Sequence, residues 1–204
     1  MNRFRTAGIV AGLALAVGVP LVATATGASG DDRLQATIAD VTGARLGSAS
    51  VSFDEGTSEV KVDLRLPASM AGFHGFHIHS VGQCLAPFTT AGGHLGENPG
   101  DVLHRHRNHD GDLPVLLVNS DGHARTRFVS DRITFAKLRD ADGSAFIIHA
   151  APDNYANIPA TDTATGAPRY SNPSNLAVYP NTVTDDATLK TGDAGARIAC
   201  GVIH

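Results

Sequence analysis

The chain has 204 residues, of which 42% are hydrophobic, and this is enough for one domain with a sizeable core. Its 16 basic and 20 acidic residues give a net charge of −4 with histidine neutral. Such a balance does not predict the basic face that nucleic-acid binding needs, so no nucleic-acid partner is expected.

The first 25 residues are typical of a secretory signal peptide. Arg3 and Arg5 precede an apolar run over residues 8–22, and the Ala-Thr-Ala at residues 23–25 fits a cleavage site. The alternative is an uncleaved membrane anchor, for which the apolar run is short. Cleavage after Ala25 removes two of the 16 basic residues and no acid, which leaves 14 basic against 20 acidic residues and a net charge of −6. We therefore expect a secreted, extracytoplasmic protein in the periplasm, cell wall or medium, with no stable membrane association.

Residues 26–32 read as a short polar linker, and residues 33–204 as one all-β domain. Apolar side chains alternate with polar ones at Val60, Val62, Leu64 and Leu66, the period of a half-buried strand. Further short apolar runs are separated by Asp-Gly turns, and no long helical period is present, which indicates an antiparallel sandwich or barrel.

Two long stretches do not fit as strands. Residues 84–114 are rich in glycine and histidine, and residues 156–196 contain four prolines without a clear period. Loops of this length inside a compact domain are usually functional or disordered, and we expect these two to be functional because they flank the residues of interest.

The only two cysteines are Cys84 and Cys200. An even number of cysteines in an exported chain indicates one disulfide. Two unrelated buried thiols would be the interpretation for a cytosolic protein.

Histidine is the residue type that carries the chemistry. The chain has ten, and His77 and His79 are two apart on a predicted strand, so they share one face and can bind one metal ion together. His74 has the opposite parity and is expected to point away. His94 follows two glycines, which allow a tight backbone turn around a site.

A second histidine group follows in the first long loop. His104, His106 and His109 lie within six residues, and Asp112 follows His109 by three. Three imidazoles and a carboxylate suit tetrahedral zinc, and imidazoles alone suit copper as well as zinc. His149 ends an apolar run and could supply another nitrogen. The alternative is a solvated histidine-rich loop without metal.

Four segments together resemble the signatures of copper/zinc superoxide dismutases, in the order of that family and over most of residues 72–203. They are Gly75-Phe76-His77-Ile78-His79, Ala91-Gly92-Gly93-His94, His109-Asp110-Gly111-Asp112-Leu113-Pro114 and Gly195 to Ile203. The resemblance implies an eight-stranded Greek-key β-barrel, sandwich-like, whose two long loops carry the site.

The resemblance also implies the ligands. Copper would be bound by His77, His79, His94 and His149, and zinc by His94, His104, His109 and Asp112. The family's spacing from Asn98-Pro99 points to His104. Gly96 and Glu97 look inserted before that pair, and the interval from His104 to His109 looks shortened, so His106 is the alternative.

Further roles follow from the same resemblance. Asp153 would link a copper histidine to a zinc histidine, and Cys84 and Cys200 would form the family disulfide. Arg197 would guide the anion, and His94 would deliver a proton. The implied activity converts superoxide into dioxygen and hydrogen peroxide. The alternative is a non-catalytic extracytoplasmic copper-binding module on the same fold. Either protein would be a monomer or a homodimer.

Overall fold

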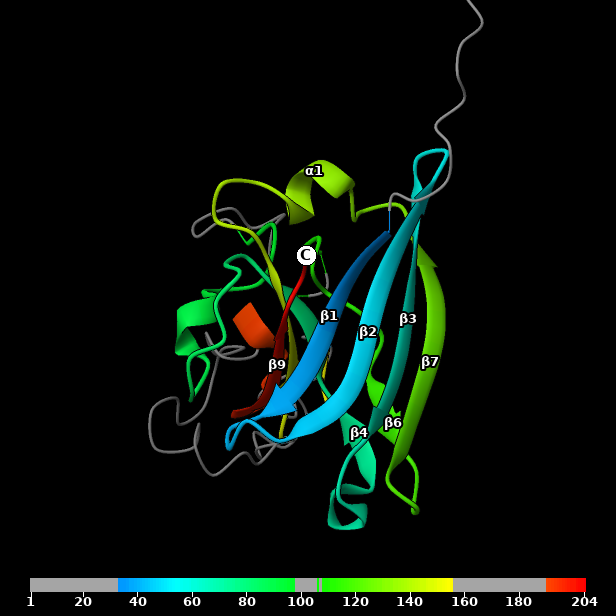
Figure 1. Cartoon of the computed structure of the whole chain (residues 1–204), viewed down its shortest axis with the longest axis vertical. Coiled ribbons are helices and arrows are strands. Elements are labelled where there is room, and N and C mark those ends of the chain that lie inside the picture. Colours follow the sequence, from blue (N-terminus) through cyan, green and yellow to red (C-terminus); the bar gives the residue numbers. More distant parts are fainter. Residues whose placement is uncertain (1–32, 98–105, 107, 156–189) are drawn as a thin grey trace, which may run out of the picture. The chain divides into compact units, whose positions relative to one another are not determined.

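The structure is a computed structural model that describes residues 33–97, 106, 108–155 and 190–204 (Figure 1). The expected signal peptide over residues 1–25, the linker over residues 26–32, His104 and most of the second long loop lie outside the described residues. Within the described part, no helix is long and apolar enough to cross a membrane.

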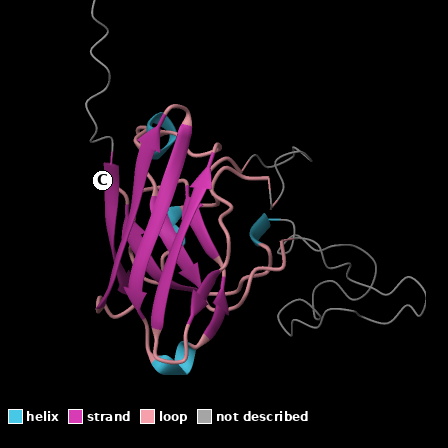
Figure 2. Cartoon of the chain, turned by 90° about the vertical axis from the view of Figure 1, so that its right-hand side faces the viewer, coloured by secondary structure: helices cyan, strands magenta, loops and turns pink. Residues whose placement is uncertain are grey.

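The described residues confirm the predicted all-β class. Among the described residues, helix occurs only in short pieces: η1 (Ala68–Met70), η2 (Thr89–Ala91), α1 (Phe135–Leu138) and the two helical residues Lys190 and Thr191 (Figure 2). The strands are β1 (Arg33–Asp40), β2 (Arg45–Asp54), β3 (Thr57–Arg65), β4 (Gly72–His74), β5 (Phe76–His79), β6 (Leu116–Val118), β7 (His123–Ser130), β8 (Ala145–His149) and β9 (Arg197–Val202).

Only Gly75 separates β4 from β5, so the nine described strands make eight extended segments. Seven strands form one antiparallel sheet in the order β5-β8-β9-β1-β2-β3-β7, and β4 pairs with β6. The continuous segment of β4 and β5 changes partners at Gly75, since β5 pairs with β8 and β4 pairs with β6. Because β6 also contacts β7, this segment connects the two ends of the curled sheet, β5 and β7. This arrangement agrees with the predicted barrel.

Alternating side chains build the core. Val60, Val62 and Leu64 of β3 are buried, while Lys61 and Asp63 between them face outward. Burying such an aliphatic side chain contributes about 1.5–3 kcal/mol. The sheet therefore presents one apolar inner face, as the sequence pattern predicted.

One edge of the sheet positions the site. The outer edge of β5 is met by the first long loop, because Ile78 N donates to Gly111 O at 2.9 Å and Leu95 N donates to Ile78 O at 2.8 Å. A side chain on Gly111 would place its Cβ 2.1 Å from Ile78 O, so only glycine allows this approach. The loop residues consequently lie directly beside the histidines of β5.

Candidate metal centre

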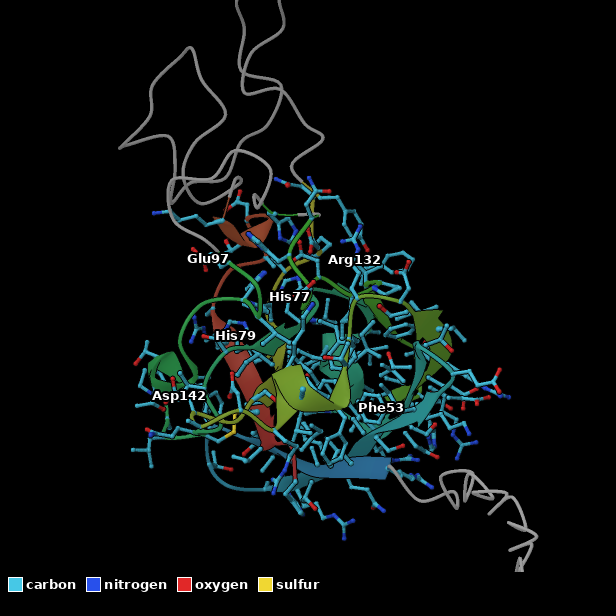
Figure 3. All side chains as sticks on the ribbon, turned by 90° about the horizontal axis from the view of Figure 1, so that it is seen from above. Phe53, His77, His79, Glu97, Arg132 and Asp142 are labelled. Carbon is cyan, nitrogen blue, oxygen red and sulfur yellow. A yellow bond between two sulfur atoms is a disulfide. The ribbon has the colours of Figure 1, made fainter. Side chains whose placement is uncertain are left out.

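His77 and His79 extend from β5 into one buried region (Figure 3). The predicted shared face is thus observed. Isolated bridges pair His77 with Asp112 and His79 with His94, so the strand brings the loop ligands to its own histidines. His149, at the end of β8, reaches the same place because β8 pairs with β5.

His74 points elsewhere, as its parity predicted. Its Nδ1 lies 2.8 Å from the carbonyl oxygen of His149, and its Nε2 lies 2.8 Å from that of Met70. Both ring nitrogens therefore contact backbone carbonyl oxygens, and His74 stabilises the end of β8 instead of binding a metal ion.

Four buried imidazoles form what we call the four-histidine group, in which one nitrogen of each ring lies within 4.8 Å of the others. Its members are His77, His79, His94 and His149. Each ring is held through its other nitrogen. His77 Nε2 contacts Asp153 at 2.6 Å, His79 Nδ1 contacts Gly92 O at 2.9 Å and His149 Nδ1 contacts Gly195 O at 3.0 Å. His94 Nδ1 contacts Asp112 Oδ1 at 2.8 Å.

The remaining nitrogen of each ring has no hydrogen-bond partner in the described part of the chain. These atoms are His77 Nδ1 and the Nε2 atoms of His79, His94 and His149. A buried polar atom without a partner costs about 1–3 kcal/mol. Four such atoms facing one another are the donor set of a metal site, and an all-imidazole set suits copper.

A second set of donors lies beside the first, and we call it the Asp112 group. Asp112 Oδ1 is 2.8 Å from His94 Nδ1, 3.1 Å from His106 Nδ1 and 3.2 Å from His109 Nδ1. The contact with His106 is not aligned as a hydrogen bond, so His106 Nδ1 also has no such partner among the described residues. Ligand atoms of a tetrahedral zinc with bonds of about 2.0 Å are roughly 3.3 Å apart, close to these separations.

His106 takes the position in this group that the sequence analysis gave preferentially to His104. His106 is 1% exposed. His104 lies outside the described residues, so its position is not compared. The insertion of Gly96 and Glu97 and the shortened interval before His109 were the sequence signals in favour of His106.

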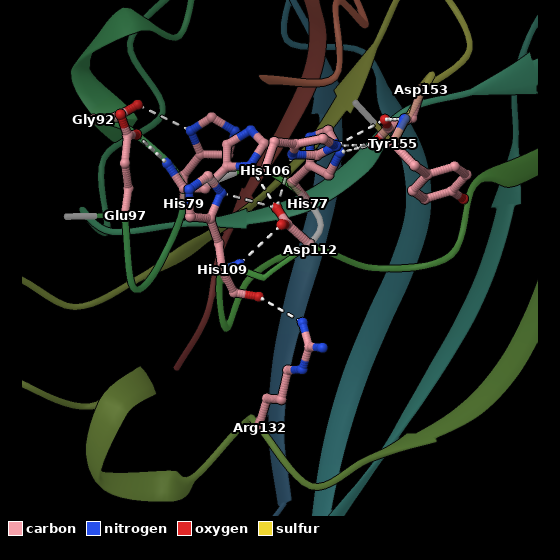
Figure 4. A network of polar contacts seen from close by, with 11 residues as sticks. His77, His79, Gly92, Glu97, His106, His109, Asp112, Arg132, Asp153 and Tyr155 are labelled. Carbon is pink, nitrogen blue, oxygen red and sulfur yellow. Dashed lines mark hydrogen bonds and ion pairs between the residues drawn. The ribbon is translucent and has the colours of Figure 1, made fainter. Parts of the chain in front are cut away.

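Asp153 joins the two groups, as Figure 4 shows. Its carboxylate lies 2.6 Å from His77 Nε2 and 2.8 Å from His106 Nε2, and it also accepts a 2.6 Å hydrogen bond from Tyr155 N. Gly192 has a φ of +60°, and a Cβ there would collide with the Asp153 carboxylate and with His106. The backbone at residue 192 can lie this close to the link only because the residue is glycine.

Burial sets the protonation state of the four-histidine group. In the absence of metal it lowers the pKa of His77 and of His149 to about 4, and burial together with the positive charge of a protonated His77 lowers the pKa of His94 to about 3. Burial also lowers the pKa of His79 well below its usual value. These imidazoles are neutral at neutral pH, which is the form that binds a metal ion.

The Asp112 group behaves in the opposite way. Burial disfavours the charged form of His106, but its close contacts with the Asp112 and Asp153 carboxylates outweigh this effect and raise its pKa to about 9. Burial also disfavours the Asp112 carboxylate, but the surrounding imidazoles hold the pKa of Asp112 well below its usual range. The group therefore favours positive charge at its centre, whether a proton or a metal cation supplies it.

Arg197 lies at the start of β9, where β9 pairs with His149. Its Nη1 donates to Phe88 O and its Nη2 donates to Gly92 O, both at 2.7 Å. Gly92 O also accepts from His79 Nδ1, so one carbonyl oxygen joins the arginine to the four-histidine group. Partial burial lowers the pKa of Arg197, but a guanidinium stays charged in proteins. The backbone contacts of Phe88 and Gly92 had no signal in the sequence.

Cys84 and Cys200 form the predicted disulfide, across a sequence separation of 116 residues. Cys200 is buried in a small apolar cluster with Phe88, Ala91, Ala145 and Ile147. The bridge thus ties the first long loop to β9, three residues beyond Arg197.

Comparison with known proteins agrees with this geometry. A family model described as copper/zinc superoxide dismutase matches residues 47–203. The Cu-Zn superoxide dismutase of Mycolicibacterium paratuberculosis is 38% identical over 173 residues, which cover 79% of this chain and 69% of that protein. The Cu-Zn superoxide dismutase of Deinococcus radiodurans is 33% identical over 174 residues, which cover 77% and 91%.

Solved structures give the same family. The Cu/Zn superoxide dismutase from Brucella abortus matches with a TM-score of 0.59 and 25% identity, over 85% of this chain and all of that one. A SOD-like protein from Bacillus subtilis matches with a TM-score of 0.55 and 26% identity, over 82% and 96%. The donor sets of the described residues suit the copper and zinc that this family implies. From its family model, its relatives and its two joined histidine groups, this chain belongs to the copper/zinc superoxide dismutases, a family of oxidoreductases.

Proposed function

We propose that this chain is an exported enzyme that converts two superoxide anions and two protons into dioxygen and hydrogen peroxide. The observation that carries the proposal is the set of four imidazole nitrogens that have no hydrogen-bond partner among the described residues, with a guanidinium tied to the same cluster through Gly92 O. Copper would be held by the four-histidine group. Zinc would be held by His94, His106, His109 and Asp112.

Copper, when bound, supplies the one-electron redox chemistry, because zinc has no accessible redox change. Arg197 then contributes a permanent positive charge that attracts the superoxide anion and orients it through a forked set of donors. Two of those donors are fixed on carbonyl oxygens, so the guanidinium is already in place before the anion arrives. Such preorganised charge needs little rearrangement during the reaction.

His94 belongs to both donor sets, and its two nitrogens have different roles. Nδ1 faces Asp112 and stays within the zinc set. Nε2 faces the other three imidazoles, and it is the atom that would carry a proton toward the reduced anion.

Asp153 holds the two donor sets in a fixed position relative to each other. It accepts from His77 Nε2 and His106 Nε2, which fixes the tautomer of both rings with Nδ1 free to bind metal. Asp112 has a different role, because it contacts His94 and His109 through their Nδ1 atoms and would join these atoms as a ligand of zinc. The chain itself thus supplies a rigid cage whose imidazoles need not turn between the two half-reactions.

Export is part of the proposal. Arg3, Arg5 and the apolar run over residues 8–22 support removal of residues 1–25 and an extracytoplasmic location. The disulfide supports an oxidising compartment. The mature chain would act as a monomer or homodimer without stable membrane association. The mass of the protein recovered outside the cytoplasm tests the removal of residues 1–25. Its size in solution distinguishes a monomer from a homodimer.

The direct test is superoxide consumption by protein loaded with copper and zinc. The rate should far exceed that of the zinc-only protein, and His79→Ala should lose both copper and activity. A loaded protein that binds one copper and yet leaves superoxide untouched would instead be a copper-binding module, which does not need Arg197.

A further inference from the structure

The two carbonyl oxygens that hold Arg197 come from the two ends of one short turn. Phe88 precedes η2 as its N-cap, and Gly92 follows it as its C-cap. The turn is closed by hydrogen bonds from Ala91 N to Phe88 O and from Gly92 N to Thr89 O, both 3.2 Å long. Arg197 therefore spans the turn from end to end.

Both ends of this turn have a positive φ, and Phe88 is in the left-handed region. Gly92 has a φ of +74°, which costs glycine little. Phe88 has a φ of +69°, which is uncommon for a bulky side chain and requires compensation from its surroundings. It is this conformation that presents Phe88 O to the guanidinium.

The compensation lies in the packing of the phenylalanine ring. Phe88 is 3% exposed and packs in the small apolar cluster with Ala91, Ala145, Ile147 and Cys200, separate from the main core. Ala145 and Ile147 belong to β8, the strand that ends in His149. The ring thus anchors the turn to the strand that carries one of the four histidines.

We propose that Phe88 is the positioning residue of Arg197: its buried ring holds the left-handed turn whose carbonyl oxygens orient the guanidinium. This inference rests on the proposed anion-guiding role of Arg197. Cys84 supplies the disulfide sulfur from the same loop, but the carbonyl groups that hold Arg197 belong to Phe88 and Gly92. Loss of the ring should therefore disorder Arg197 even while the disulfide remains intact.

The test compares variants of the full mature protein loaded with copper and zinc. Phe88→Ala removes the anchor, and Phe88→Gly removes the same ring while favouring the observed φ, so it is the second variant if the alanine protein folds poorly. Phe88→Leu keeps an apolar anchor and should rescue. Leu64→Ala, a truncation in the main core on β3, is the matched control for a general loss of stability.

The first readout is azide binding to the oxidised copper protein, followed by its charge-transfer absorption. Azide is a small monovalent anion, so its affinity reports how well Arg197 is placed. We expect Phe88→Ala to weaken azide binding roughly tenfold, because a misplaced charged donor loses much of its effect. Arg197→Ala should weaken it at least as much, and the double variant no further. Phe88→Leu and Leu64→Ala should bind azide like the wild type.

The second readout is the Arg197 guanidinium itself, observed by NMR of nitrogen-15-labelled arginine in the reduced, diamagnetic protein. Separate, slowly exchanging Nη protons in the wild type should merge in Phe88→Ala and Phe88→Gly. Unchanged azide affinity and Nη signals in both ring-deleting variants, with Arg197→Ala still weakening azide, would overturn the role of Phe88 alone. Unchanged azide affinity in Arg197→Ala would overturn the anion-guiding role and this inference with it.

Discussion

The disulfide offers the most quantitative prediction. Cys84 and Cys200 close a loop across 116 residues, and for a loop of that length the chain-entropy model gives about 4.8 kcal/mol of stabilisation. We expect Cys84→Ala/Cys200→Ala to lower the unfolding free energy of the metal-free protein by that order. For a domain of this size the melting temperature should fall by roughly 10–20 °C.

The assay is equilibrium urea unfolding after metal removal by chelation, so that metal binding does not mask the difference. Wild-type protein reduced by a thiol reagent is the matched control, because it lacks the bridge without any change of side chain. Agreement between the reduced protein and the double variant would assign the loss to loop closure. A loss below about 1 kcal/mol in both would refute the entropy argument.

The other predictions concern the metal ligands, the arginine and pH. His106→Ala and His109→Ala should each lose zinc while some copper remains, and His104→Ala should keep zinc; elemental analysis showing the reverse for His104 and His106 would contradict the assignment. Arg197→Glu should lose at least about tenfold in dismutation rate with copper retained. Added salt should change the wild-type rate little, because it screens both the attraction by Arg197 and the repulsion by the net negative chain. In Arg197→Glu both effects repel the anion, so added salt should raise the rate; near-normal activity in this variant would remove the anion-guiding role. The metal-free protein should be most stable near pH 6.5. Below that pH, His77 and His149 become protonated in the unfolded chain but stay neutral in the folded protein, where their pKa values are about 4. The free energy of unfolding therefore falls with falling pH, by up to about 1.4 kcal/mol per pH unit for each ring. Above it, the stabilisation from His106 fades as the pH rises through its pKa of about 9. Urea unfolding between pH 4 and 9 that gives a monotonic curve would contradict this reasoning.

Much of the site could be predicted from the sequence because strand geometry is regular. A spacing of two puts His77 and His79 on one face, and the same rule turned His74 away. The disulfide could be predicted because the sequence has only two cysteines, so an exported chain offers each of them one partner within the chain. The inward face of β3 followed from a period of two.

What could not be predicted depends on irregular backbone. Choosing between His104 and His106 needs the path of a loop with inserted residues, and no period governs such a loop. Phe88 gives no chemical signal, because it acts through its carbonyl oxygen and a left-handed turn. The link from Gly92 O to both His79 and Arg197 likewise involves a main-chain atom, which every residue possesses.

The pairing of the first long loop with β5 has a consequence for solubility. β5 is the last strand of the seven-stranded sheet, and its outer backbone groups are satisfied by Gly111 and Leu95. The same loop segments carry His94 and Asp112, so metal ions bound to these residues would help to keep the loop paired with β5. Without the loop, the edge of β5 would offer unpaired N–H and C=O groups to a second molecule. Chelation should therefore weaken the hold of this loop on β5 and favour strand-to-strand self-association of the metal-free protein.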